Sequence, residues 1–234
     1  MGALRFLIRL ALILAVVAGM YLWALRDRGW TPIDRAIAPI DSGNMPMTIA
    51  VLGTSLSARG DWPDAVATRL GGCLNRRVTV QRFAEAGANS GWGRARIADV
   101  IAARPDLVLI EFAVNDADLR DGVSLADSIL NHTAMLRGLA RDLPDARVAL
   151  VTTSPVFGLR GWLRPRLTTY YASYGDLAAD AGTGVIDLYA RWRDLPDARA
   201  LFPDGLHPDA ASATALIAPV VTEAIGRAAG RSCG

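Results

Sequence analysis

At 234 residues the chain is long enough for one domain and an additional segment, and its 52% hydrophobic content supplies a core. All 25 positions counted as Lys or Arg are Arg, which excludes Schiff-base, P-loop and general-base lysines. A formal net charge of +2 without a long basic block argues against a nucleic-acid partner, and two His and two Cys that are distant in sequence predict no metal site and no cofactor.

The first segment of the chain is apolar. From Leu4 to Leu25 its only charged residues are Arg5 and Arg9, and this length is sufficient to cross a bilayer as a helix. The alternative is a signal peptide cleaved after residue 18, but the apolar run continues past that site. We therefore expect residues 1–28 to form an uncleaved transmembrane helix, whereas cleavage would give a secreted protein.

A proline-containing stretch follows the apolar segment. Residues 29–46 include Pro32, Pro39 and Pro46 and show no sustained periodicity, which is typical of a linker. The globular domain is therefore predicted to cover residues 47–234.

Short apolar runs alternate with helical patterns through this domain. The predicted buried parallel strands are Thr48–Leu52, Val78–Phe83, Leu107–Phe112, Val148–Thr152 and Gly184–Leu188. The predicted helices are Asp61–Leu70, Gly93–Ala103, Ser124–Leu143, Arg166–Ala181 and Pro208–Ala229. The alternation predicts an open α/β/α sandwich with crossover helices on both faces, in which ligands bind beyond the carboxyl ends of the strands.

Four polar blocks follow the first three strands and precede the last helix. They are Gly53-Thr54-Ser55-Leu56-Ser57, Ala86-Gly87-Ala88-Asn89-Ser90-Gly91, Ala113-Val114-Asn115-Asp116 and Asp204-Gly205-Leu206-His207-Pro208. In this order they resemble the sequence blocks of the SGNH (GDSL-type) hydrolase family, across almost all of the predicted domain. The resemblance implies the SGNH hydrolase fold, a flavodoxin-like three-layer α/β/α sandwich with a mainly parallel sheet of about five strands.

The resemblance also implies a catalytic triad. Ser55 corresponds to the nucleophile, His207 to the general acid/base and Asp204 to the residue that orients His207. A serine hydroxyl needs such partners because it is a poor nucleophile until an imidazole accepts its proton. The three-residue spacing of Asp204 and His207 suits a turn that leads into a helix, with Pro208 at the first helical position.

An oxyanion hole is implied by the same blocks. Its donors would be the backbone N–H of Ser55, the backbone N–H of Gly91 and the side-chain amide of Asn115, with Gly87 as the alternative to Gly91. Such donors stabilise the charge that develops on the tetrahedral intermediate, and the loss of one typically costs about 3 to 4 kcal/mol.

A few residues in and near the blocks remain open to interpretation. Thr54 and Ala113 replace the Asp and Gly that are usual in the family, which affects activity more than the fold. His132 lies on the apolar stripe of its helix and is expected to be a hydrogen-bonded core residue. Trp92 is expected either to line the pocket or to pack in the core. Residues 157–166 are expected to form either a substrate lip or membrane-facing loop, or a solvated connection.

The two cysteines lie near the end of the first domain helix and near the end of the chain. Cys73 and Cys233 are expected to form a disulfide in an oxidising compartment, with two free thiols as the alternative. Such a bridge would attach the C-terminal tail to the body of the domain.

Together these features predict an exported, membrane-anchored serine esterase, with its domain in the periplasm of a bacterial cell. Its substrate is expected to be a short acyl or O-acetyl carbohydrate ester, hydrolysed through an acyl-Ser55 intermediate. One alternative is an acyltransferase that uses the same triad. The other is a non-catalytic envelope binding or scaffold protein, although a scaffold has no physical need for Ser55, Asn115, Asp204 and His207 together.

Overall fold

The computed structural model describes residues 5, 9–17, 30–41, 43 and 45–234. One compact unit contains residues Pro32–Gly234, and residues 9–17 of the preceding unit are helical. Among the described residues, no helix combines the length and the apolar composition needed to cross a membrane. Most of the transmembrane helix predicted over residues 1–28 lies outside the described residues.

The centre of the compact unit is a parallel β-sheet. Its strands are β1 (Met47–Gly53), β2 (Val78–Ala84), β3 (Leu107–Glu111), β4 (Arg147–Thr152) and β5 (Gly184–Asp187), in the spatial order β2-β1-β3-β4-β5. The chain moves from β1 outward to β2 and then returns to β3 on the other side of β1. The carboxyl ends of β1 and β3 therefore adjoin at a topological switch point, where open α/β sheets bind their ligands.

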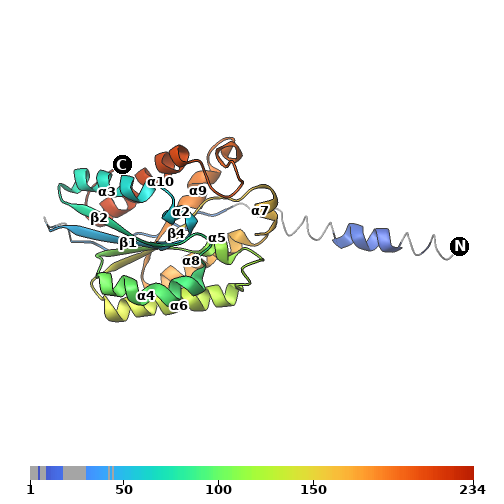
Figure 1. Cartoon of the computed structure of the whole chain (residues 1–234), viewed down its shortest axis with the longest axis horizontal. Helices are drawn as coiled ribbons and strands as arrows, with labels where there is room; N and C mark the ends of the chain where they lie inside the picture. The colour runs from blue at the N-terminus through green and yellow to red at the C-terminus, as the bar shows by residue number, and fades with distance from the viewer. Residues whose placement is uncertain (1–4, 6–8, 18–29, 42, 44) are drawn as a thin grey trace. The chain divides into compact units, whose positions relative to one another are not determined.

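Long helices cover both faces of the sheet (Figure 1). One face carries α3 (Trp62–Leu74) and α10 (Ala210–Ala228), and the other carries α4 (Ser90–Ala103), α6 (Leu125–Asp142) and α8 (Leu167–Ala181). Short elements at the ends of strands and in connections are α2 (Ser55–Ala58), α5 (Ala113–Asp116), α7 (Gly158–Trp162), α9 (Leu188–Arg193) and the 3₁₀ helix η1 (Ala198–Leu201). The chain thus has the predicted α/β fold with a five-stranded parallel sheet between helices.

Alternating side chains of the strands form the core. On β1, Ile49 and Val51 point to the same face and are at most 1% exposed, and they pack in one cluster with Trp62, Val66 and Val221 from α3 and α10. Because helices cover both faces, every residue of β3 is also buried. This explains why the strands appear in the sequence as continuous apolar runs.

The predicted strands and long helices are confirmed, with shifts of a few residues at their ends. Phe112 and Leu188, predicted as the last residues of strands, are instead the N-cap of α5 and the first residue of α9. The short helices α2, α5, α7 and α9 were absent from the sequence-based expectation, because elements of four to six residues carry no measurable helical periodicity.

Part of the stretch predicted as a linker packs against the sheet. Arg35 forms an antiparallel bridge with Val185 of β5, through N–H···O distances of 3.0 and 2.9 Å. The Ile33 N–H donates to Asp187 Oδ2 at 3.0 Å, and Ile37 is buried in the core. These contacts cover the outer edge of β5, an edge that would otherwise be open to pairing with another chain.

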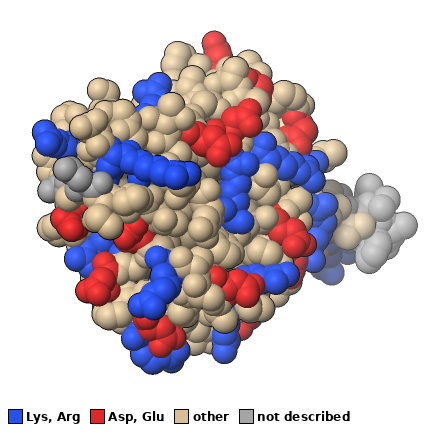
Figure 2. Space-filling view, turned by 60° about the vertical axis from the view of Figure 1, so that its left-hand side comes forward, with Lys and Arg blue, Asp and Glu red and all other residues tan. Residues whose placement is uncertain are grey.

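Charged side chains are distributed in a mixed pattern on the face drawn in Figure 2. Arginines and carboxylates are interspersed there, with apolar and neutral residues between them. The electrostatic potential over this face therefore has no single sign. Proteins that bind the phosphate backbone of a nucleic acid instead present a continuous basic stripe.

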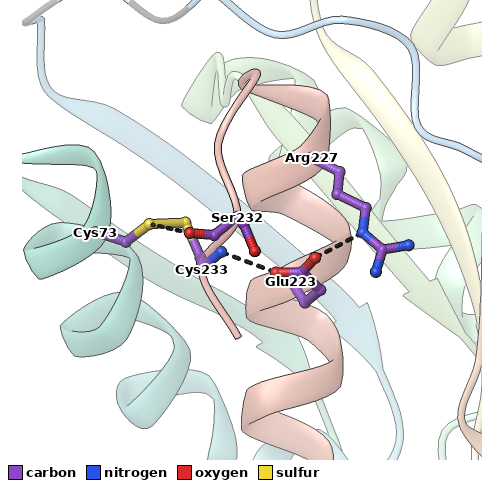
Figure 3. Close-up of a disulfide and its surroundings, with 5 residues drawn as sticks. All are labelled: Cys73, Glu223, Arg227, Ser232 and Cys233. Carbon is purple, nitrogen blue, oxygen red and sulfur yellow. Dashed lines mark hydrogen bonds and ion pairs between the residues drawn. A yellow bond between two sulfur atoms is a disulfide. The ribbon is translucent and has the colours of Figure 1, made fainter.

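A disulfide joins Cys73 of α3 to Cys233 in the C-terminal tail, with a Cα–Cα distance of 5.6 Å (Figure 3). The tail is held next to α10, where the Cys233 N–H donates to Glu223 Oε2 at 2.8 Å and Arg227 Nε donates to Glu223 Oε1 at 2.6 Å. A side chain at Gly226 would place its Cβ 2.6 Å from Cys233 Sγ, so glycine is needed for this close approach. The bridge therefore attaches the C-terminal tail, which is held next to α10, to α3 on the same face of the sheet.

Replacing both cysteines by serine is expected to lower the free energy of unfolding by about 2 to 4 kcal/mol, because the bridge closes a loop of 160 residues in the unfolded chain. Urea denaturation of the wild type and the double variant measures this difference. Thiol titration of the denatured, unreduced wild type is the control and should find no reactive thiol. Two reactive thiols would show that the bridge does not form.

Candidate active site

Ser55 lies where β1 ends and α2 begins. Thr54 is the N-cap of α2, with extended backbone angles, and its side chain accepts a hydrogen bond from the Leu56 N–H at 3.3 Å. The Trp62 Nε1–H donates to the Leu56 carbonyl at 3.1 Å and holds the other side of the turn. This strand-turn-helix arrangement places Ser55 at the carboxyl edge of the sheet.

A chain of hydrogen bonds connects Ser55 to a carboxylate far away in the sequence. Ser55 Oγ lies 2.8 Å from His207 Nε2, and His207 Nδ1 lies 2.8 Å from Asp204 Oδ2. Because a carboxylate only accepts hydrogen bonds, Nδ1 carries the proton and Nε2 is free to accept from the serine hydroxyl. This geometry can transfer a proton from Ser55 to His207.

The Asp204 carboxylate is held by its own loop. Its Oδ1 accepts the backbone N–H groups of Leu206 at 2.9 Å and His207 at 2.7 Å. Partial burial acts to raise the pKa of Asp204, but these bonds and the His207 ring outweigh it, so the pKa lies well below its ordinary value. Asp204 therefore stays ionised and fixes the orientation of the imidazole.

The connection that contains α7 packs against this loop. The Phe157 N–H donates to the Gly205 carbonyl at 2.7 Å, and a Cβ at Gly205 would lie 2.6 Å from the Phe157 oxygen. Gly205 also has a φ of +78°, so both its conformation and its surroundings require glycine. Arg160 Nη2 lies 3.4 Å from Asp204 Oδ2, the oxygen that faces His207.

The outer surface of α7 is apolar. Leu159 and Trp162 are 80% and 65% exposed, whereas Arg164 just after the helix is buried and pairs with buried Asp118 at 2.8 Å. Arg164 Nε also donates to the Val114 carbonyl at 2.7 Å, which connects this segment to α5. Residues 157–166 are therefore anchored next to Asp204 and present the apolar side chains of Leu159 and Trp162 to solvent.

Asn115 lies in α5, beyond the carboxyl end of β3. Its Nδ2 donates to the Ala88 carbonyl at 2.8 Å, which leaves one hydrogen of the amide for a further acceptor. Ala88 lies between the two candidate glycines. Gly87 has a φ of +82° in the turn after β2, and Gly91 lies in the first turn of α4, where backbone N–H groups have no intrahelical acceptor.

Buried polar residues hold α4, α5 and α6 together. Asp116 is 1% exposed, and its two oxygens accept the Ser90 N–H at 2.7 Å and the Ser128 hydroxyl at 2.5 Å. Sequence reasoning assigned no role to Asp116, although it follows Asn115 directly. It fixes the start of α4 relative to the helix that carries Asn115.

His132 is confirmed as a hydrogen-bonded core residue. Its Nδ1 donates to the Ser128 carbonyl at 2.8 Å, and its Nε2 accepts from the Tyr174 hydroxyl at 3.0 Å. Burial lowers the pKa of His132, so the ring is neutral in this role. The Tyr174 oxygen in turn accepts the N–H groups of Phe112 and Ala113, which supports the end of β3. Trp92 packs on Phe112 and also faces Arg96.

Sequence reasoning also missed Glu111, the last residue of β3. Its buried carboxylate accepts hydrogen bonds from Thr54 and Ser57, the residues that flank the Ser55-Leu56 dipeptide. The only available signal was an acidic residue inside an apolar run. In the part of the chain that the structure describes, no three His, Cys, Asp or Glu side chains gather as metal ligands would.

Comparison with known proteins agrees with this geometry. Residues 49–215 match the model of the GDSL-like lipase/acylhydrolase family. A human isoamyl acetate-hydrolyzing esterase 1 homolog is 27% identical over 172 residues, which cover 64% of this chain and 68% of the relative.

Two solved structures share the fold. A lipase/acylhydrolase from Enterococcus faecalis superposes with a TM-score of 0.67 and 23% identity, over 76% of this chain and 95% of that one. A psychrotrophic esterase from Pseudoalteromonas sp., inhibited by monoethylphosphonate, gives a TM-score of 0.60 and 22% identity, over 77% and 97% of the two chains.

Proposed function

Because the chain belongs to the GDSL-like lipase/acylhydrolase (SGNH hydrolase) family, we propose that this esterase or acylhydrolase uses Ser55 as its nucleophile, His207 as general acid/base and Asp204 to orient His207. The observation that carries the proposal is the relay from Ser55 Oγ through His207 to Asp204, with 2.8 Å at each step. The lengths and the order of the two bonds are those that a serine hydrolase needs.

The reaction proceeds in two steps. In the first, Ser55 Oγ attacks the ester carbonyl while its proton moves to His207 Nε2, and the resulting imidazolium gives this proton to the departing alcohol. In the second, His207 removes a proton from water, the hydroxide attacks the acyl-Ser55 carbonyl, and the proton returns to Ser55 as the acid leaves. Asp204 stabilises the imidazolium in both steps.

The oxyanion is stabilised by three donors. These are the backbone N–H groups of Ser55 and Gly91 and the amide of Asn115, with Gly87 as the alternative to Gly91. The hydrogen bond from Asn115 to Ala88 supports this role, because it fixes the amide beside the segment that contains both glycines. Preorganised donors of this kind act on the transition state without further rearrangement.

We propose a short acyl ester or an O-acetylated carbohydrate as the substrate. The name of the human relative describes hydrolysis of isoamyl acetate, a short acyl ester, which supports the first class. The disulfide indicates an oxidising compartment outside the cytoplasm. The apolar residues before Arg26 support attachment to the outer face of a bacterial inner membrane.

Acyl transfer is the second candidate function. The same relay would form acyl-Ser55, and a sugar hydroxyl would replace water in the second step. Adding sugar acceptors and measuring how product divides between free acid and acylated sugar distinguishes transfer from hydrolysis.

The Ser55→Ala variant is expected to lose at least about 1,000-fold in kcat on p-nitrophenyl acetate, because the loss of a triad serine leaves only the residual effect of the oxyanion hole and binding. Steady-state rates of the wild type and the variant, across several acyl chain lengths, measure this. Leu130→Ala, an exposed apolar residue of α6, is the matched control and should keep the wild-type rate. Equal rates for wild type and Ser55→Ala would overturn the assignment.

The Gly91→Pro variant tests the choice between the two glycines, because proline removes the N–H and is tolerated in the first turn of a helix. If Gly91 is a donor, kcat should fall by about 100- to 1,000-fold while the melting temperature changes little. Unchanged kcat in a folded variant would assign the role to Gly87.

A further inference from the structure

We propose that Glu111 is a positioning residue for the nucleophile and that its carboxylate must be ionised for full activity. This inference rests on the proposed role of Ser55. Glu111 does not contact Ser55 itself, but it binds the residues on both sides of the Ser55-Leu56 dipeptide.

The contacts of Glu111 converge on one short turn. Its Oε1 accepts the Thr54 N–H at 2.6 Å and the Ser57 hydroxyl at 2.7 Å, and its Oε2 accepts the Thr54 hydroxyl at 2.9 Å. Thr54 precedes Ser55, and Ser57 follows it within α2. Three donors of the turn therefore bind one carboxylate at the end of β3, which holds the turn that carries the nucleophile.

The backbone around Glu111 is shaped to allow these contacts. Gly53 of β1 pairs in register with Glu111 of β3, and a Cβ at Gly53 would lie within 2.7 Å of the Glu111 carboxyl carbon. Glycine at this position leaves the space that the carboxylate occupies. The block around Ser55 therefore needs Gly53 to leave room for Glu111.

Threonine in place of the usual aspartate at position 54 suits this arrangement. A Thr hydroxyl can donate to Glu111, whereas an ionised aspartate only accepts hydrogen bonds. The Thr54 oxygen also accepts a hydrogen bond from the Leu56 N–H, so the same hydroxyl links the carboxylate to the start of α2. Thr54, which replaces the family's usual aspartate, is therefore one of the residues that bind Glu111.

The protonation state of Glu111 changes what it can do. The carboxylate accepts all three donors, but a protonated acid must donate one hydrogen, which forces a Thr54 or Ser57 hydroxyl to turn from donor to acceptor. Glu111 is 2% exposed, and burial raises its pKa to about 7 against the opposing effect of these hydrogen bonds. The ionised form therefore appears in the pH range in which esterases are assayed.

The other groups around Glu111 carry no charge that would offset this change. The charge of Glu111 acts on Tyr171 and Tyr174 of α8, and burial keeps both neutral by raising their pKa values. Glu111 also lines a small cavity of about 20 Å³ together with Thr153, Ser154 and Trp192, none of which carries a charge. Among the described residues no cation forms an ion pair with Glu111.

As the pH rises, ionisation of Glu111 should increase activity and lower the free energy of unfolding. Below about pH 4.5 the group is protonated in both the folded and the unfolded chain, so its stabilising effect is fully present. This effect is lost as the pH rises through about 7, because the unfolded chain releases the proton more easily. Activity rises over the same interval.

The test is the pH profile of kcat/KM for p-nitrophenyl acetate in the wild type and in Glu111→Gln. If Glu111 must be ionised, the acid limb of the wild-type log plot should include one proton loss that Glu111→Gln lacks, so its slope should be greater by 1 than the slope of the variant. In Glu111→Gln kcat should also fall roughly 10- to 100-fold at nearly constant KM, as expected for a slightly misplaced nucleophile. Equal slopes in the wild type and the variant, or an unchanged kcat in the variant, would overturn the proposal.

Two further variants keep the test decisive. Thr54→Val retains the carboxylate but removes one bond to it, so the acid limb should keep its slope and move to higher pH, even if Glu111→Gln fails to fold. Asp187→Asn removes another buried carboxylate, at the end of β5, and should leave the slope of the acid limb as in the wild type. An unshifted limb in Thr54→Val contradicts the proposal.

Assaying Ser55→Ala in parallel distinguishes a failure of the proposed function from a failure of the proposed role of Glu111. Activity retained in Ser55→Ala would refute the proposed function. An inactive Ser55→Ala together with a wild-type profile in Glu111→Gln would refute only the role of Glu111.

Discussion

The order of the strands in the parallel sheet determines where the residues of the candidate active site lie. Because β2 and β3 lie on opposite sides of β1, the turn after β1 and the helix after β3 meet at one edge of the sheet. Ser55 and Asn115 therefore both follow strands that end at this edge, although they lie sixty positions apart in the sequence. The last loop before α10 then needs only to reach this edge for His207 to contact Ser55.

A second layer of buried polar contacts makes this edge rigid. Glu111 holds the turn with Ser55, Asp116 holds the start of α4, and Tyr174 holds the end of β3. Each contact uses a side chain from one element to bind backbone N–H groups of another, and so holds the loops at this edge in place. The buried pair of Arg164 and Asp118 extends the same support towards α7.

The fold and the relay were predictable from short-range patterns. Apolar runs located the strands. The block around His207 matches the family pattern and the block around Ser55 departs from it only at Thr54, so the resemblance implied that Ser55 and His207 would meet. Glu111 was not predictable, because a single carboxylate at the end of an apolar run has no pattern until β1 and β3 are paired in register. The packing of residues 32–41 against β5 was not predictable either, because prolines and a lack of periodicity are typical of a linker.

We propose that His207 activates Ser55, which then forms a covalent acyl-enzyme. Treatment with a fluorophosphonate followed by peptide mapping by mass spectrometry probes this activation, because the reagent reacts with an activated serine and remains attached. A single adduct is expected on the peptide that contains Ser55, and none on that peptide in the His207→Ala variant. An adduct on another residue, or no adduct in the active wild type, would show that Ser55 is not the activated nucleophile.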